Sequence, residues 1–124
     1  MPVLYSIIES PTHPRLSDLY AELGIDEVQL TSMRKAISEL KTNPPDYVVA
    51  EFFYGYGNNY AGVNVSNLDV FLYSLQKYAP QAKVIVLADK TDIEHVSKLP
   101  KELTPHAVLL QPVSRGQMAE QLQA

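Results

Sequence analysis

Five short apolar runs alternate with segments of helical periodicity, and this alternation limits the folds open to the chain. Three of the runs, VLYSII, KVIVLA and AVLL, are almost continuously apolar. Such continuity is typical of strands that are covered on both faces of a parallel sheet. The five expected strands are Val3–Ile8, Glu27–Leu30, Tyr47–Phe53, Lys83–Ala88 and Ala107–Leu110.

The other segments repeat apolar residues every three or four positions, which predicts helices over residues 14–24, 32–41, 66–80, 91–100 and 114–123. Two of them open with the spacing of a capping box, Thr91 with Glu94 and Ser114 with Gln117. Strands that alternate with helices predict an α/β fold with right-handed crossovers. We expect a flavodoxin-like, doubly wound five-stranded parallel sheet of order 2-1-3-4-5 in three layers, with residues 1–124 as a single domain.

Composition narrows the classes of function. The chain has 10 basic and 14 acidic residues, and the basic ones are scattered, which argues against nucleic acid as a partner. No apolar run approaches the roughly 20 residues that span a bilayer, so no membrane association is expected. The absence of Cys excludes disulfides and thiol chemistry. The start of the chain does not resemble a signal peptide, so a cytoplasmic location is expected.

In a doubly wound sheet, ligands bind beyond the carboxyl ends of the strands. The chain has no glycine-rich phosphate loop at these points, so we expect no nucleotide or flavin cofactor. Glu9, Glu51 and Asp89 follow three of the strands, and their convergence would make a hard-cation site. The first loop offers only one acid, so no metal is expected. The three histidines, His13, His95 and His106, are expected to be surface or capping residues.

Several segments together resemble response-regulator receiver domains. PDYVVAEF, residues 45–52, is similar to the third-strand signature of that family. VLYSIIES resembles its first strand with the acidic pair, and KVIVLAD its fourth strand. HAVLLQPVSRGQMAEQL resembles its closing strand and last helix, including a proline that is typically preceded by a cis bond. The resemblance covers nearly the whole chain and implies a cis Gln111–Pro112 bond.

The resemblance also assigns the positions of receiver chemistry. The phosphoryl-accepting Asp of the family corresponds to Glu51, and the two Mg²⁺-binding acids correspond to Glu9 and Ser10. The hydroxyl residue after the fourth strand corresponds to Ala88, and the conserved Lys of the family corresponds to Gln111. One metal-binding acid, a hydroxyl donor and a cation are therefore replaced together.

These replacements imply a degenerate receiver that is not phosphorylated. Phosphoryl transfer depends on in-line positioning and on neutralising the charge of the transferred group. Glu51 itself allows two interpretations. It mimics the phosphorylated state, or it has drifted after the chemistry was lost. Because Ala88 and Gln111 offer neither a hydroxyl nor a cation, drift is favoured.

A long segment separates the third strand from the third helix. It runs from Tyr54 to Val65 and contains Tyr54, Tyr56 and Tyr60 among glycines and asparagines, and Phe53 ends the strand before it. Typical connections in α/β units have roughly 2–6 residues, and longer ones are often functional. We expect these aromatics to form a partly exposed surface that binds a protein. A lid that packs over the degenerate pocket and a small-molecule site are the alternatives.

Three hypotheses of function follow. The first is a non-catalytic, receiver-like adaptor that acts by protein–protein interaction in a bacterial signalling assembly. The second is a ligand-binding or enzymatic domain whose pocket is lined by Glu9, Glu51, Asp89 and the tyrosines. The third is a domain that works as a homodimer through its helical faces.

Overall fold

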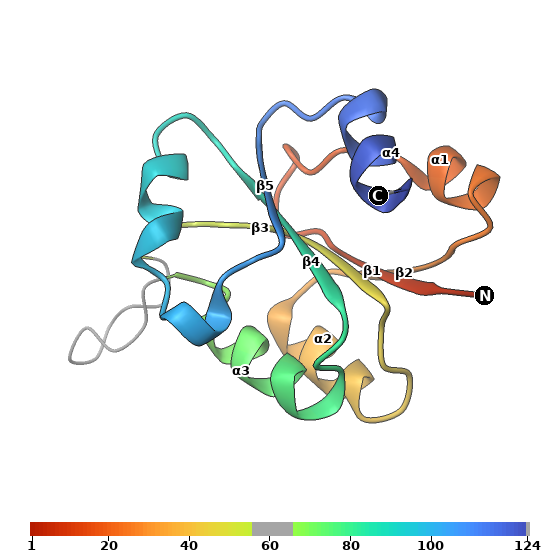
Figure 1. The fold of residues 1–124 in the computed structure, drawn as a ribbon, viewed down its shortest axis with the longest axis horizontal. Coiled ribbons are helices and arrows are strands. Elements are labelled where there is room, and N and C mark those ends of the chain that lie inside the picture. The colour runs from red at the N-terminus through yellow and green to blue at the C-terminus, as the bar shows by residue number, and fades with distance from the viewer. Residues whose placement is uncertain (56–65, 124) are drawn as a thin grey trace.

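The computed structural model describes residues 1–55 and 66–123. Figure 1 shows strands and helices alternating along the chain. The strands are β1 (Val3–Ile7), β2 (Asp26–Leu30), β3 (Tyr47–Glu51), β4 (Lys83–Ala88) and β5 (Ala107–Leu110). The α-helices are α1 (Ser17–Glu22), α2 (Met33–Leu40), α3 (Asp69–Tyr78) and α4 (Arg115–Gln123). Two 3-10 helices, η1 (Ile93–Lys98) and η2 (Lys101–Leu103), lie between β4 and β5.

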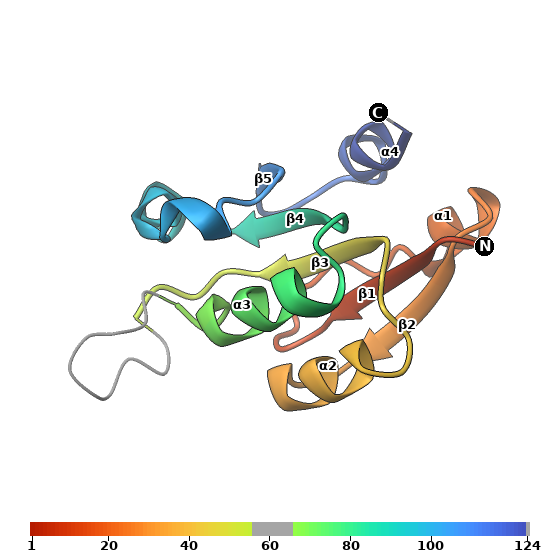
Figure 2. The same ribbon diagram turned by 60° about the horizontal axis from the view of Figure 1, so that its bottom comes forward.

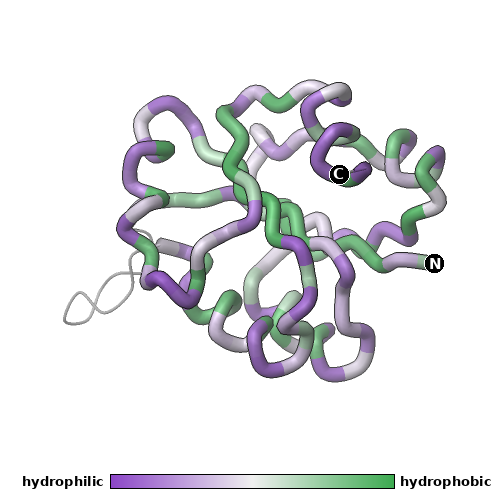
Figure 3. The backbone as a smooth tube through the Cα atoms, in the orientation of Figure 1, coloured by the Kyte–Doolittle hydropathy of each residue, from purple (hydrophilic) through white to green (hydrophobic). Residues whose placement is uncertain are grey.

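The strands form one parallel sheet of order β2-β1-β3-β4-β5, which confirms the predicted winding. Helices α2 and α3 cover one face, and α1 and α4 cover the other (Figure 2). The apolar central strands lie inside these two layers (Figure 3). Among the described residues, no helix is long and apolar enough to cross a membrane.

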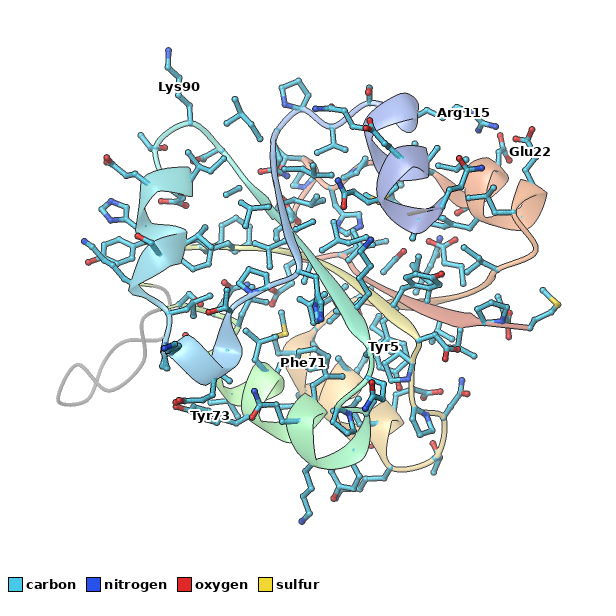
Figure 4. All side chains as sticks on the ribbon, viewed as in Figure 1. Tyr5, Glu22, Phe71, Tyr73, Lys90 and Arg115 are labelled. Atoms are coloured by element: carbon cyan, nitrogen blue, oxygen red, sulfur yellow. The ribbon has the colours of Figure 1, made fainter. Side chains whose placement is uncertain are left out.

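Side chains alternate between the two faces because successive residues of a strand point in opposite directions. Tyr5 packs with α2 and α3, together with the buried Phe71, whereas Leu4 packs with α1 and α4 (Figure 4). On the second face, Arg115 of α4 forms an ion pair with Glu22 of α1. The two cores therefore share one sheet.

The α-helix expected over residues 91–100 is wrong, because this segment forms η1 instead. The segment stops at Leu99, whose extended backbone is what a following proline favours. The predicted Thr91–Glu94 box is also wrong, since Asp89 accepts the backbone N–H groups of Thr91 and Asp92. At α4 the predicted box is confirmed: Ser114 and Gln117 exchange side-chain and backbone hydrogen bonds.

Candidate functional site

Glu51 is the last residue of β3 and is completely buried, with 0% of its surface exposed. It follows Val49 in the alternation of the strand, so its side chain points to the face covered by α1 and α4. The loop between β1 and α1 and the end of β5 cover it there. The phosphoryl-accepting position suggested by the sequence is therefore sealed from solvent.

Three side chains donate hydrogen bonds to one carboxylate oxygen of Glu51. Ser10 Oγ and Thr12 Oγ1 each lie 2.6 Å from Oε2, and Gln111 Nε2 lies 3.1 Å from it. The two hydroxyl oxygens are also 2.6 Å apart. Ala88 and Gln111 bring neither a hydroxyl nor a cation to Glu51, but Gln111 reaches it as a neutral donor and Thr12 supplies a hydroxyl from a different loop.

His13 is not the surface or capping residue that the sequence predicts. It is 2% exposed, and its Nδ1 lies 3.8 Å from Oε1 of Glu51. A turn in which the His13 N–H bonds to the Ser10 carbonyl brings the residue inward. Neither ring nitrogen has a hydrogen-bond partner among the described residues. Burial lowers the pKa of His13, and the nearby Glu51 charge opposes that shift.

Glu9 lies on the other side of the β3 end and contacts Asn67 rather than a second acid. The Asn67 Nδ2 donates to Glu9 Oε1 and to the Glu51 carbonyl oxygen, both at 2.8 Å. Burial raises the pKa of Glu9, the Asn67 hydrogen bond lowers it, and the charge of Glu51 raises it further. Glu9 thus serves as an acceptor for the segment that leads into α3.

Ala88, the position of the receiver hydroxyl, and Asp89, the third acid of the suggested cation site, contribute little to this cluster. Ala88 is fully buried in the core and offers no polar group. Asp89 is exposed and turned toward η1, where its Oδ1 accepts from Thr91 and Asp92. Glu9, Glu51 and Asp89 therefore do not gather into the cluster that a hard-cation site would need. Within the part of the chain that is described, no three acids or histidines are grouped to hold a metal ion.

Phe53 separates two small cavities at this edge of the sheet. One, of about 300 Å³, is lined by Thr12, Phe53, Asp89, Gln111 and Pro112. The other, of about 250 Å³, is lined by Glu9, Thr31, Ser32 and Phe53. The acids of the single pocket in the second hypothesis are thus divided, with Glu9 in one cavity, Asp89 in the other and Glu51 sealed beneath. The Gln111–Pro112 bond beside the larger cavity is cis, as predicted.

The chain leaves and rejoins the sheet edge at a neck, which we define as residues 53, 54, 66 and 67. Phe53 N donates to Asn67 Oδ1 at 2.8 Å, and Asn67 N donates back to the Phe53 carbonyl at 3.4 Å. Tyr54 and Ser66 form an isolated antiparallel bridge. Residues 53 and 54 are therefore held beside residues 66 and 67.

Tyr54 is 43% exposed and rests on η1. Its ring stacks on His95 with centroids 3.9 Å apart, and Lys98 Nζ lies 3.2 Å from its hydroxyl and 4.6 Å from the ring centroid. Tyr54 thus combines an exposed ring with a fixed position, while Phe53 is half-buried. The predicted patch residues Tyr56 and Tyr60 lie outside the described residues.

The sequence did not single out three residues of this site: Thr12, His13 and Asn67. Thr12 and His13 lie in a connection without periodicity and Asn67 lies at the start of the predicted third helix, and each acts on a partner that is distant in the chain. A weak signal for Asn67 was available, because Asn favours turns and helix starts through its side-chain hydrogen bonds. No local signal indicated that His13 lies against Glu51.

Comparison with known proteins finds the fold in response regulators. The chain is similar to a response regulator receiver domain protein from Clostridium thermocellum, with 18% identity and a TM-score of 0.70 over 99% of this chain and 92% of the other. It is also similar to a CheY-like receiver domain protein from Methanospirillum hungatei, with 11% identity and a TM-score of 0.71 over 98% and 89%. A third similar structure is NtrX from Brucella abortus, with 11% identity and a TM-score of 0.74.

The match to NtrX covers 98% of this chain but only 26% of that protein. No protein-family model matches the chain, and no curated protein matches its sequence. Identities this low establish the fold alone. Strand order, winding and the structural matches agree, and the chain is therefore a receiver-like domain in its fold.

Proposed function

We propose that this chain is a phosphorylation-independent, non-catalytic receiver-like signalling adaptor that acts through protein–protein contacts. The observation that carries the first half of the proposal is the complete burial of Glu51 beneath Ser10, Thr12 and Gln111. A phosphoryl donor must approach an acceptor oxygen in line, and here Oε2 already accepts three hydrogen bonds while Oε1 is buried against His13.

The surroundings of Glu51 also lack the groups that would stabilise a phosphoryl group in transfer. Ser10 stands in place of a metal-binding acid and points to Glu51, and Ala88 brings no hydroxyl donor. Gln111 brings a neutral amide in place of a cation. Loss of one such electrostatic contact costs about 3 kcal/mol in the transition state. Several losses together support a domain that works without phosphorylation.

Two measurements test this half of the proposal. Thermal unfolding is followed with and without beryllofluoride and Mg²⁺, and the intact mass is measured after incubation with acetyl phosphate and Mg²⁺. We expect no rise in melting temperature and no added phosphate. A variant carrying Ser10→Asp, Glu51→Asp, Ala88→Thr and Gln111→Lys is the positive control, because it restores the receiver groups on the same fold. A Mg²⁺-dependent adduct at Glu51 of the wild type would falsify the proposal.

The contact surface that we propose centres on Tyr54 and extends to Tyr56 and Tyr60 by their place in the sequence. Tyr54 is exposed and held by His95 and Lys98, so a partner finds the ring already ordered. Exposed tyrosines offer a large contact area at low entropic cost, which is why they recur at interfaces. The partner is a second protein or a second copy of this chain.

Substitution of the three tyrosines by Ser tests this surface. Sedimentation velocity measures self-association, and cross-linking in native lysate measures capture of a partner. We expect the triple variant to keep its melting temperature and to lose whichever association the wild type shows. Tyr73→Ser is the matched control, because Tyr73 is an exposed tyrosine of α3. Retained association in the folded triple variant would place the interface elsewhere.

The role of Glu51 in that association is tested separately with Glu51→Gln, which keeps the shape of the side chain and removes its charge. If Glu51 mimics the phosphorylated state, partner binding falls. If it is a relic of lost chemistry, partner binding is unchanged and only stability responds. Because Thr12 and Gln111 donate to this carboxylate, the mimic has partners that the sequence alone did not reveal.

A further inference from the structure

The larger cavity beside Phe53 has the chemistry of a ligand site that the proposed adaptor function does not use. It lies at the carboxyl ends of the strands, where open α/β sheets bind ligands. Its volume of about 300 Å³ fits a small organic molecule. Phe53 and Pro112 give it apolar walls, and Thr12, Asp89 and Gln111 give it polar groups.

The hydrogen-bond donors of the polar lining side chains are already engaged within the protein. Gln111 Nε2 donates toward Glu51, and toward the carbonyl and hydroxyl oxygens of Thr12 at 3.3 and 3.5 Å. The Thr12 hydroxyl donates to Glu51, and its backbone N–H donates to Ser10. Pro112 has no N–H. Among the described residues that line the cavity, the side-chain groups that remain open to a ligand are therefore acceptors.

Asp89 is the one charged residue among the described residues that line this cavity. Hydrogen bonds from the backbone of Asp92 and the side chain of Thr91 lower the pKa of Asp89, so it is ionised at neutral pH. All of these bonds go to Oδ1, and Oδ2 accepts none from the described part of the chain. The neighbouring Lys90 extends outward from the molecule (Figure 4).

The Asp89 carboxylate has one oxygen that no described residue engages, and the cavity also offers apolar walls and further acceptors. These features favour a ligand that carries hydrogen-bond donors and a positive charge. We propose that this cavity binds a small organic ammonium compound, with its apolar body against Phe53 and Pro112 and its ammonium group at Asp89. The net charge of -4 favours the approach of such a cation. The proposal is independent of the adaptor function.

Three probes that share one phenylethyl body and differ in charge test the proposal on the wild-type protein. They are phenethylammonium, 2-phenylethanol and 3-phenylpropanoate, each titrated while backbone amide signals are followed by NMR. We expect phenethylammonium to bind most tightly, the alcohol more weakly and the anion least. The shifted signals should include those of Phe53, Asp89 and Gln111. Equal binding of the alcohol and the ammonium, signals shifted elsewhere or no shifts at all would overturn the proposal.

Asp89→Asn removes the charge and keeps an oxygen that can accept the hydrogen bonds from Thr91 and Asp92. We expect it to weaken phenethylammonium binding about fivefold, the size of one partly exposed ion pair. Binding of 2-phenylethanol should stay unchanged, which also shows that the variant is folded. The control is Glu94→Gln on η1, which removes an exposed acid outside the cavity lining. Unchanged ammonium binding in Asp89→Asn would refute the site.

Discussion

At the scale of single residues, the end of β3 is governed by how each polar group is satisfied. Glu51 Oε2 takes three donors, whereas Oε1 faces a His13 ring that forms no hydrogen bond among the described residues. A buried polar group without a partner costs roughly 1–3 kcal/mol. The end of β3 therefore contains a well-satisfied oxygen, Oε2, and an unsatisfied contact between Oε1 and His13. The effect of pH on stability follows from the contact with His13.

His13 should make the protein less stable in mild acid. Its pKa is lowered by burial from the ordinary 6.5, so the unfolded chain binds a proton that the native protein refuses. The stability is present above pH 6.5 and is lost as pH falls below it, with a slope of up to about 1.4 kcal/mol per pH unit. Urea unfolding between pH 7.5 and 5 on a grid of about half a unit measures this slope.

In the same experiment, His13→Leu should flatten the dependence on pH near 6, whereas the partly exposed His95→Gln control should keep it. A wild-type curve and a His13→Leu curve with equal slopes would show that folding does not lower the pKa of His13.

Glu9 should respond in the opposite sense. Its pKa is raised from 4.5, chiefly by burial, so its ionised form is disfavoured in the native protein at neutral pH. Glu9→Gln keeps an acceptor for Asn67 and should raise the free energy of unfolding at pH 7 by less than about 1 kcal/mol. The gain should vanish below pH 4.5, where the wild-type side chain is protonated in both states. Glu120→Gln on the exposed side of α4 is the control, and a loss of stability in Glu9→Gln contradicts the assignment.

At the scale of elements, the neck joins β3 to α3 through one side chain. Asn67 donates to Glu9 and to the Glu51 carbonyl, and it accepts from Phe53. A helix start that is tied in this way cannot shift without breaking contacts at the strand end. The neck therefore couples Glu9 and Glu51 to the start of α3.

Asn67→Ala should lower the free energy of unfolding by about 1–3 kcal/mol, because it leaves partly buried donors and acceptors unpaired. Asn43→Ala is the matched control, since its side chain donates one long hydrogen bond of 3.4 Å to Glu39. Denaturant titration of both variants measures the difference. Equal small losses would show that the neck is held by the Tyr54–Ser66 bridge instead.

The elements divide by how much of them could be predicted from sequence. The central strands and the helix faces follow from local apolar patterns, and the α4 capping box follows from Ser114 and Gln117 three residues apart. The η1 segment was misjudged because the turn that Asp89 stabilises by accepting from Thr91 and Asp92, and the stop before Pro100, override a weak helical pattern. The site was only half predictable. Glu51 and Glu9 follow from their places at the ends of strands, but Thr12 and His13 are brought to the site by the loop between β1 and α1, which has no hydrophobic periodicity.

At the scale of the whole molecule, one sheet supports two cores. Tyr5, Val48 and Val86 face α2 and α3, whereas Leu4 and Leu87 face α1 and α4. Neither core is complete without the strands that it shares with the other. A substitution that destabilises the core on one face of the sheet should therefore lower the unfolding midpoint of both faces.

Phe71→Ala empties a fully buried position on the α3 face and should cost about 3–5 kcal/mol. The adjacent Val70→Ala is the control, because Val70 is 55% exposed and should cost little. Thermal unfolding is monitored by circular dichroism and by the NMR signal of the Met118 methyl group, which lies on the opposite face of the sheet. For Phe71→Ala, both probes should give the same lowered midpoint. Two separate midpoints would mean that the layers unfold independently.

The bridge between Tyr54 and Ser66 has a consequence for engineering and for divergence of the chain. Two backbone positions that are paired in an isolated antiparallel bridge offer adjacent attachment points for the sequence that joins them. Lengthening such a connection adds only about 0.6 kcal/mol of closure cost for each doubling of its length. A foreign peptide can therefore replace residues 56–65 and be displayed on the α/β domain. Insertions between Tyr54 and Ser66 should likewise lower the free energy of unfolding only slightly.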